Sequence, residues 1–215
     1  GYKDIDFVLT TRELAVMIKQ AGIDFRNLEP SHYDSVMGDS TGAAVIFGAT
    51  GGVMEAALRT AYEIVTGKEV PFTNLNITPV RGMEGVKEAT IKIEGCTDDW
   101  KFLEGAELKV AIAHGLVNAN KIMREVRTGK SPYHFVEIMA CPGGCIGGGG
   151  QPIPTSMDIR KKRMKAIYSE DEHMVLRKSH ENPDVIAIYK EFLGKPNSHL
   201  AHELLHTHYV EREGY

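Results

Sequence analysis

Short apolar runs alternate with amphipathic stretches over the first two thirds of the chain. Residues 6–9 form an apolar run that predicts a short strand. The amphipathic helix predicted next has Thr10 at its N-cap and Glu13 three residues later, the pattern of a capping box. A second apolar run, at 43–47, predicts a short buried strand or extended segment, and an amphipathic helix is predicted over 53–65. The order of strand and helix is typical of an α/β fold.

The middle of the chain continues this pattern. Apolar side chains at every second position, such as Ile91 and Ile93, predict half-buried strands. The predicted elements are an extended segment at 72–79, strands at 89–94, 108–113 and 134–139, and a helix at 115–127.

The character of the sequence changes after Thr155, where helical patterns follow one another with polar joints. We therefore predict two domains, an α/β body over 1–153 and an all-helical tail over 154–215. The helices of the tail are expected at 156–168, 171–178, 183–193 and 198–207.

Composition excludes several classes of protein. The 215 residues are 42% hydrophobic and 25% charged, which is ordinary for a globular protein. A net charge of −4 carries no basic excess, so we expect no nucleic-acid partner. No apolar run of 18 residues is present, and we expect no membrane span. The chain opens on Gly1 without a signal-peptide pattern, which predicts a processed or truncated N-terminus.

Three cysteines are too few for a disulfide scaffold and indicate a reducing, cytoplasmic location. Cys96 lies in the connection between two predicted strands and is interpreted as a turn or core cysteine. Cys141 and Cys145 flank Pro-Gly-Gly, and four glycines follow shortly after them. Glycines allow close approach of the backbone to a bulky group and leave N–H groups free, as an iron–sulfur cluster requires. A disulfide loop, a redox thiol pair and half of a zinc site remain alternatives.

The number of cysteines limits what this loop can do alone. A [4Fe–4S] cluster takes four thiolate ligands, whereas the loop offers two. A cluster held here would therefore need ligands from outside the chain, either from a missing segment or from another subunit.

A glycine-rich turn, Gly48–Gly52, precedes the helix predicted at 53–65. It lacks the Lys-Ser/Thr of a P-loop and the spacing of a Rossmann motif, which disfavours nucleotide binding. Two interpretations remain: a helix N-terminus that faces an anionic or bulky cofactor, and a tight turn with a purely structural role.

The tail contains His202-Glu-Leu-Leu-His206, which matches the H-E-x-x-H signature of zinc proteases. Such a site needs a third ligand, and only nine residues follow His206. A packed helix is the favoured interpretation, and a zinc hydrolase that uses His202 and His206 is the less favoured alternative.

Taken in order, several segments resemble iron-only ([FeFe]) hydrogenases over nearly the whole chain. They are Val8–Leu14, Phe47–Arg59, Val80–Gly82, the Cys141–Gln151 loop and the tail Ala201–His206. The resemblance covers the second half of that family's catalytic domain and implies a mixed sheet flanked by helices, with a small-subunit-like tail fused behind it.

By this resemblance, Cys141 would ligate the [4Fe–4S] cubane of the H-cluster, and Cys145 would ligate the cubane and bridge to the two-iron subcluster. Met139 and Phe47 would line the pocket of the two-iron unit. The implied reaction is reversible reduction of protons to H2 with ferredoxin or a similar electron carrier. The family's other two cluster cysteines, its proton-delivering cysteine and its cyanide-contacting lysine are absent from the 215 residues. We therefore expect the isolated chain to be inactive and to partner with the missing N-terminal half of the catalytic domain.

A non-catalytic module like the hydrogenase-like proteins of iron–sulfur assembly is the main alternative. Without its cluster, the glycine-rich loop from Cys141 to Gly150 is expected to be mobile.

Overall fold

The computed structural model describes residues 5–32, 37–208 and 210. Single turns of 3₁₀ helix connect many of its elements, and one π-helical turn follows α6. The helices and strands are, in chain order, α1 (Thr11–Gln20), α2 (Gly42–Val45), α3 (Gly52–Thr66), β1 (Val86–Lys92), β2 (Glu107–His114), α4 (Leu116–Arg127), β3 (Phe135–Met139), α5 (Met157–His173), α6 (Pro183–Ile188) and α7 (His199–Leu205).

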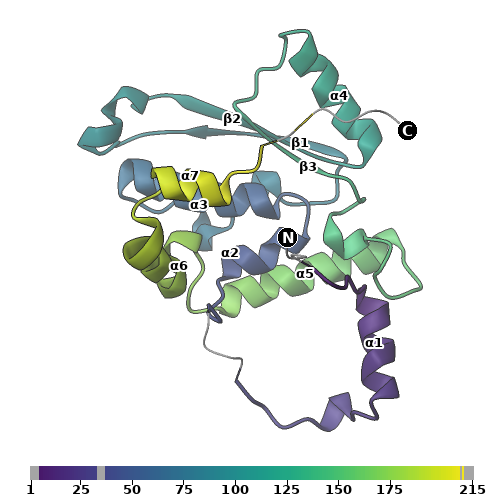
Figure 1. The fold of residues 1–215 in the computed structure, drawn as a ribbon. Coiled ribbons are helices and arrows are strands. Elements are labelled where there is room, and N and C mark those ends of the chain that lie inside the picture. Colours follow the sequence, from purple (N-terminus) through teal and green to yellow (C-terminus); the bar gives the residue numbers. More distant parts are fainter. Residues whose placement is uncertain (1–4, 33–36, 209, 211–215) are drawn as a thin grey trace.

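A mixed three-stranded sheet forms the centre of the body (Figure 1). β1 runs antiparallel to β2, and β3 runs parallel to β2 after the crossover through α4. In this register Lys92 pairs with Glu107 at one end of the sheet, and His114 pairs with Met139 at the other. The structure thus confirms the predicted mixed sheet with flanking helices, and it confirms a helical tail.

Helices cover both faces of the sheet. Met54 and Leu58 of α3 pack against Val110 and Ile112 on one face. On the other face, Ile122 of α4 packs against alanines of β2. β2 is therefore buried on both sides, which explains its nearly continuous apolar sequence.

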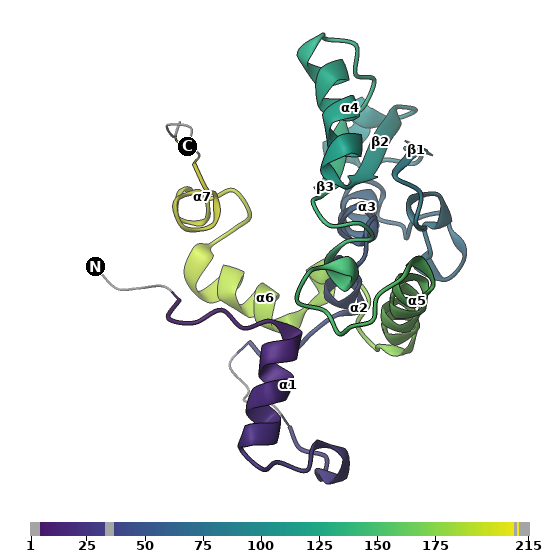
Figure 2. The same ribbon diagram turned by 90° about the vertical axis from the view of Figure 1, so that its right-hand side faces the viewer.

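The first helix of the tail belongs to the packed body. Met164 and Tyr168 of α5 share a core cluster with Ile46, Ala49 and Ile146, so that α5 supports both the turn before α3 and the cysteine loop. Figure 2 shows α5 lying alongside α2.

Buried charges join α3 to α5. The guanidinium of Arg59, in α3, is fully buried and donates two hydrogen bonds of 2.8 Å to the carboxylate of Asp171. It also bonds Glu55 at 2.7 Å, and Arg177 donates to Asp171 at 2.7 Å. Arg81 adds two bonds to Glu55. Every buried charge in this group has a partner, as burial of charge requires.

Two parts of the chain extend away from the body (Figures 1 and 2). Helix α1 has the predicted capping box, with Thr10 and Glu13 bonded reciprocally. It has no buried residue, and its apolar side chains, such as Leu14 and Met17, are about half exposed. Helices α6 and α7 form the second extension, on which Phe192 and Leu204 are exposed.

Four sequence predictions of local structure were wrong. Residues 6–9 form no strand, and Phe7 and Val8 are exposed with no neighbouring strand in the described chain. The apolar run 43–47 is helical, because the Thr41 side chain caps α2. A short apolar run does not distinguish a strand from a buried helix. Single 3₁₀ turns replace the extended segment expected at 72–79, and no separate helix occupies 171–178, because α5 continues to His173.

Candidate functional site

The cysteine loop begins where β3 ends. Met139 is the last residue of β3, and Cys141 follows it directly after Ala140. Because β2 and β3 are parallel, the loop emerges beside the carboxyl end of β2, next to His114. The N-terminus of α3 lies at the same place, since the amide of Thr50 donates a 3.0 Å bond to the carbonyl of Gly143.

The loop has a defined backbone path. Successive turns are closed by the amides of Gly144, Gly147 and Gly148, which donate to carbonyls three residues earlier at 2.9–3.0 Å. From α5, the guanidinium of Arg163 donates to the carbonyls of Ile146 and Pro152 at 2.9 and 2.8 Å. The tail therefore anchors the loop on its far side.

Close packing explains one of the glycines in the loop. Gly144 has a positive φ of 91°. A Cβ at this position would lie 2.8 Å from the amide nitrogen of Thr50 and 2.9 Å from the carbonyl oxygen of Gly48. Only glycine allows the loop to approach the turn before α3 so closely.

The N-terminus of α3 is occupied by a side chain of the protein. The carboxylate of Glu137, in β3, accepts bonds from the amides of Gly51 and Met54 at 2.6 and 2.7 Å. Beside it, Lys87 donates to the carbonyl of Thr50 at 3.2 Å. Because a buried carboxylate already takes these donors, the hypothesis of an anionic cofactor at this helix end is wrong, and that of a bulky cofactor stays a prediction. The sequence signal for Glu137 was a lone acidic residue inside an apolar strand, which the hydrophobic periodicity alone does not single out.

Replacing Glu137 by glutamine is expected to lower the free energy of unfolding by about 1.5–3 kcal/mol. The amide keeps one acceptor oxygen, but it loses the second acceptor and the charge that faces the helix dipole and Lys87. Urea denaturation measures the change, with Glu107→Gln at an exposed position of β2 as the control. A Glu137→Gln variant as stable as the control would contradict the assigned cap.

All three cysteines are free thiols, of which Cys96 is buried, Cys141 is partly buried and Cys145 is exposed. Cys96 follows β1 and lies beyond the Lys92–Glu107 end of the sheet, whereas Cys141 lies beyond the His114–Met139 end. The eight residues of β2 separate these ends by roughly 20 Å. Cys96 therefore belongs to a different part of the molecule, and the loop offers two thiolate ligands.

The surroundings of the two thiols fit part of an iron–sulfur site. Among contacts between described residues, the amides of Cys145 and Ile146 donate to no oxygen or nitrogen. Backbone amides free of other partners are the groups that stabilise cluster sulfur, and Gly144 has the positive φ typical of such anion-binding turns. Four thiolates complete a [4Fe–4S] cluster, so the loop supplies half of the ligand set.

The two other residues singled out from the sequence, Phe47 and Met139, come from segments that adjoin this loop in space or along the chain. Phe47 is 46% exposed and sits in the 3₁₀ turn Ile46–Gly48, whose first residue, Ile46, shares a core cluster with Ile146. Met139 is partly buried at the end of β3. The structure thus places both at the edge of the body from which the cysteines emerge.

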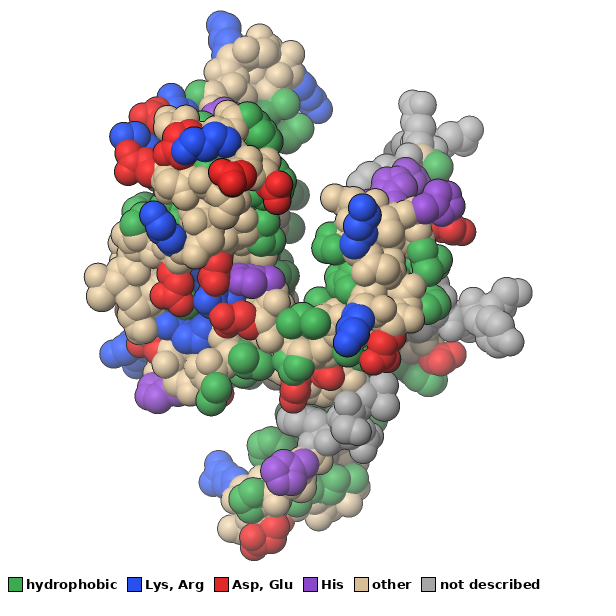
Figure 3. All heavy atoms as spheres, turned by 90° about the vertical axis from the view of Figure 1, so that its left-hand side faces the viewer, with side chains coloured by type: hydrophobic (Ala, Val, Ile, Leu, Met, Phe, Trp, Pro, Cys, Tyr) green, Lys and Arg blue, Asp and Glu red, His purple; other side chains and the backbone are tan. Residues whose placement is uncertain are grey.

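The histidines of the H-E-x-x-H segment lie in and directly after α7, in the second extension from the body. Figure 3 shows histidine side chains gathered near its free end. The ring nitrogens of His202 and His206 approach each other, but no described carboxylate, histidine or thiol completes a three-ligand group with them. The one such group in the described residues is Glu63, His180 and Glu181, where the Lys178 ammonium already pairs with both carboxylates at 2.8 Å.

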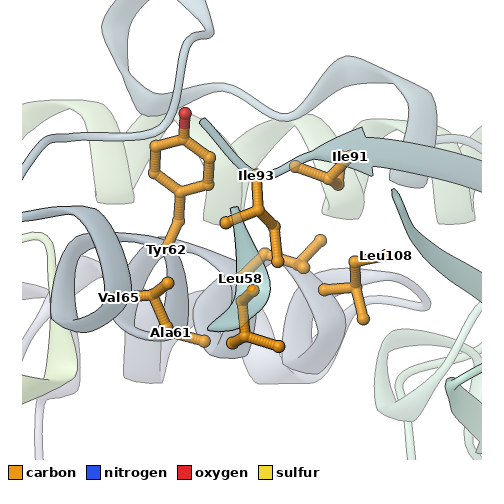
Figure 4. A pocket seen from close by; sticks show the side chains of 8 residues that line it. Leu58, Ala61, Tyr62, Val65, Ile91, Ile93 and Leu108 are labelled. Atoms are coloured by element: carbon orange, nitrogen blue, oxygen red, sulfur yellow. The ribbon is translucent and has the colours of Figure 1, made fainter. Parts of the chain in front are cut away.

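An apolar cavity of about 210 Å³ lies far from Cys141 and Cys145. Its walls come from the second half of α3 and from β1, β2 and their connection, including Leu58, Tyr62 and Ile91 (Figure 4). These residues lie toward the Lys92–Glu107 end of the sheet. The cavity offers no charged or metal-binding side chain, so the candidate site remains the cysteine loop.

Known proteins resemble this chain over nearly its full length. Residues 1–149 match the iron only hydrogenase large subunit, C-terminal domain, and residues 157–212 match the iron hydrogenase small subunit. The NADP-reducing hydrogenase subunit HndD of Solidesulfovibrio fructosivorans is 49% identical over 99% of this chain, which spans 34% of that protein. Protein NAR1 of Arabidopsis thaliana is 34% identical over 96% of this chain, which spans 42% of it.

Solved structures show the same fold. The [FeFe]-hydrogenase HydA1 of Chlamydomonas reinhardtii superimposes with a TM-score of 0.77 at 44% identity, over 96% of this chain and 56% of its own. In the part of the chain that the structure describes, no helix is long and apolar enough to cross a membrane. The matches cover both the body and the tail, and on this basis the chain belongs to the iron-only hydrogenase family.

Proposed function

We propose that this chain supplies one half of the H-cluster site of an [FeFe] hydrogenase, with Cys141 and Cys145 as thiolate ligands of the [4Fe–4S] cubane and Cys145 also bridging to the two-iron subcluster. The carrying observation is the placement of two free thiols on an anchored glycine-rich loop, with Cys96 a sheet length away. Two ligands then have to come from elsewhere.

When bound, the H-cluster supplies the redox chemistry of reversible proton reduction to H2, with electrons from ferredoxin or a similar carrier. The residues of this chain hold and enclose it. The amides of Cys145 and Ile146 would be available to the sulfur of the cluster, and Met139 and Phe47 would line its two-iron side and exclude water.

The upstream half of the catalytic domain is the proposed partner. This chain spans between about a third and a little over a half of the relatives described above. The apolar face of α1 is exposed, which fits a surface that another part of the enzyme covers.

We also propose that the chain consists of a body, residues 1–153, and a tail, residues 154–215. We propose a cytoplasmic location for it, and we expect the isolated chain to show no H2 turnover.

Cysteine substitutions test the ligand assignment. The chain would be co-produced with the adjoining upstream segment of the catalytic domain of the Solidesulfovibrio relative and reconstituted anaerobically. We expect Cys141→Ser and Cys145→Ser each to lower the cluster iron from about four per complex to below about one. Cys96→Ser is the matched control and should retain the iron. Equal iron content in all three variants would contradict the assignment.

A non-catalytic module of the cluster-assembly type is the second candidate, because the chain also resembles Protein NAR1 over 96% of its length. Such a module would bind iron with its upstream half but evolve no H2. Hydrogen evolution from reduced ferredoxin separates the two functions, provided that it is measured on the complex after the two-iron subcluster has been supplied in addition to the cubane.

A further inference from the structure

A buried histidine contacts the midpoint of the cysteine loop. His114 is the last residue of β2 and is 6% exposed. Its Nδ1 accepts a 3.1 Å bond from the amide of Gly143, and its Nε2 lies 3.2 Å from the carbonyl oxygen of Met83. An amide only donates and a carbonyl only accepts, so these partners require a neutral ring with its hydrogen on Nε2.

Gly143 is held from both sides. While its amide donates to His114, its carbonyl accepts from the amide of Thr50 at 3.0 Å. Gly143 lies midway between Cys141 and Cys145, is buried, and has a positive φ of 89°. A rotation of its peptide groups would redirect the chain on which both thiols are carried.

We propose that His114 is a positioning residue, which fixes the Cys141–Cys145 loop in its cluster-binding conformation through the acceptor Nδ1. The inference rests on the proposed role of the two cysteines as cluster ligands. Among the described residues that bond the loop, His114 is the one side chain that accepts from it, whereas Arg163 donates to it from the other side.

Two substitutions of His114 distinguish the roles of its two ring nitrogens. His114→Asn places a carbonyl oxygen at the reach of Nδ1 and keeps the acceptor for Gly143. His114→Gln places an amide nitrogen at the reach of Nε2, which keeps the donor to Met83 and loses the acceptor. If the Nδ1 acceptor positions the loop, His114→Asn keeps the loop in its conformation and His114→Gln does not.

Amide hydrogen exchange of Gly143 in the metal-free chain is the primary readout, measured by NMR. We expect exchange to be at least about tenfold faster in His114→Gln, and within about threefold of the wild-type rate in His114→Asn. Equal exchange rates in the wild type and both variants would overturn the proposal. Rapid exchange at Gly143 in the wild type would overturn it as well, because the loop would then be mobile whatever His114 does.

Alkylation of Cys96 controls for unfolding, because this buried thiol lies at the other end of the sheet. We expect it to remain slow in both variants. Exposure of Cys96 in both would overturn the proposal, because the ring would then be needed for the whole fold. Exposure in the Gln variant alone would overturn it too, because the Nδ1 acceptor would then be needed for the whole fold and not for the loop in particular.

Iron loading of the reconstituted complex distinguishes this proposal from the function on which it rests. We expect lower iron in His114→Gln and unchanged iron in His114→Asn. If the wild-type complex binds no iron while the exchange contrast persists, the cluster assignment fails and the positioning of the loop by His114 stands.

Discussion

Replacing Asp171 by asparagine is expected to lower the free energy of unfolding by about 3–5 kcal/mol. Asp171 is fully buried and accepts from both Arg59 and Arg177. Asparagine keeps the volume but turns an NH2 group toward guanidinium donors, which leaves two arginines short of a counter-charge. Breaking a buried pair costs far more than breaking an exposed one, because the remaining charge cannot be solvated.

Chemical denaturation of Asp171→Asn measures this effect, and Glu94→Gln is the matched control. Glu94 pairs with Lys92 on the surface, where both side chains are about 60% exposed, and its loss should change stability by less than about 1 kcal/mol. A loss below about 1 kcal/mol for Asp171→Asn would contradict the account of how α5 is fixed to α3.

The same carboxylate predicts acid sensitivity. Burial alone would raise the pKa of Asp171, but hydrogen bonds from Arg59 and Arg177 outweigh burial and hold the pKa below its ordinary value of 3.8. The folded state therefore releases this proton more readily than the unfolded chain. The stabilisation is complete above the ordinary value and is lost as the pH falls through it toward the folded pKa.

Lys87 is expected to make the protein more stable as the pH rises from about 8 to 10.5. Burial lowers the pKa of Lys87 to about 8, although Glu137 and Glu84 oppose the shift. Between the two pH values the unfolded chain keeps a proton that the folded lysine has released. Stability rises where the unfolded state binds more protons, and for this one group the gain is about 3 kcal/mol.

Comparison with Lys87→Met isolates this contribution from other groups that titrate in alkali. The free energy of unfolding would be measured for both proteins at several pH values between 7 and 10.5. We expect the stability difference, wild type minus variant, to grow with pH. A constant difference across this range would show that the folded and unfolded pKa values of Lys87 coincide.

The sequence allowed prediction of the elements with a strong local signal. The capping box at Thr10 and Glu13 and the alternation around Ile91 both correspond to elements of the structure. The apolar run at 43–47 forms a helix because Thr41, just before it, caps α2 and because α2 packs against α5, which lies far away in the sequence. Tertiary contacts decide whether such a short apolar segment forms a strand or a helix.

The residues of the candidate site also differ in how strongly the local sequence indicates them. The cysteine loop was found from its composition, because Cys-Pro-Gly-Gly-Cys carries its own chemical signal. Glu137 and His114 were missed, since each lies in an apolar strand and contacts a segment distant in sequence. An isolated polar residue in a buried strand is the signal that could have pointed to both of them.

The most direct test of the central claim is the iron and acid-labile sulfide content of the anaerobically purified chain, measured alone and together with the upstream catalytic segment, with zinc determined in the same samples. The half-site account predicts no cluster iron in the chain alone, and about four iron and four sulfide per complex once the upstream segment is present. Iron and sulfide near four per pair of chains, without that segment, would contradict it, because two copies would then complete a cluster by pooling Cys141 and Cys145.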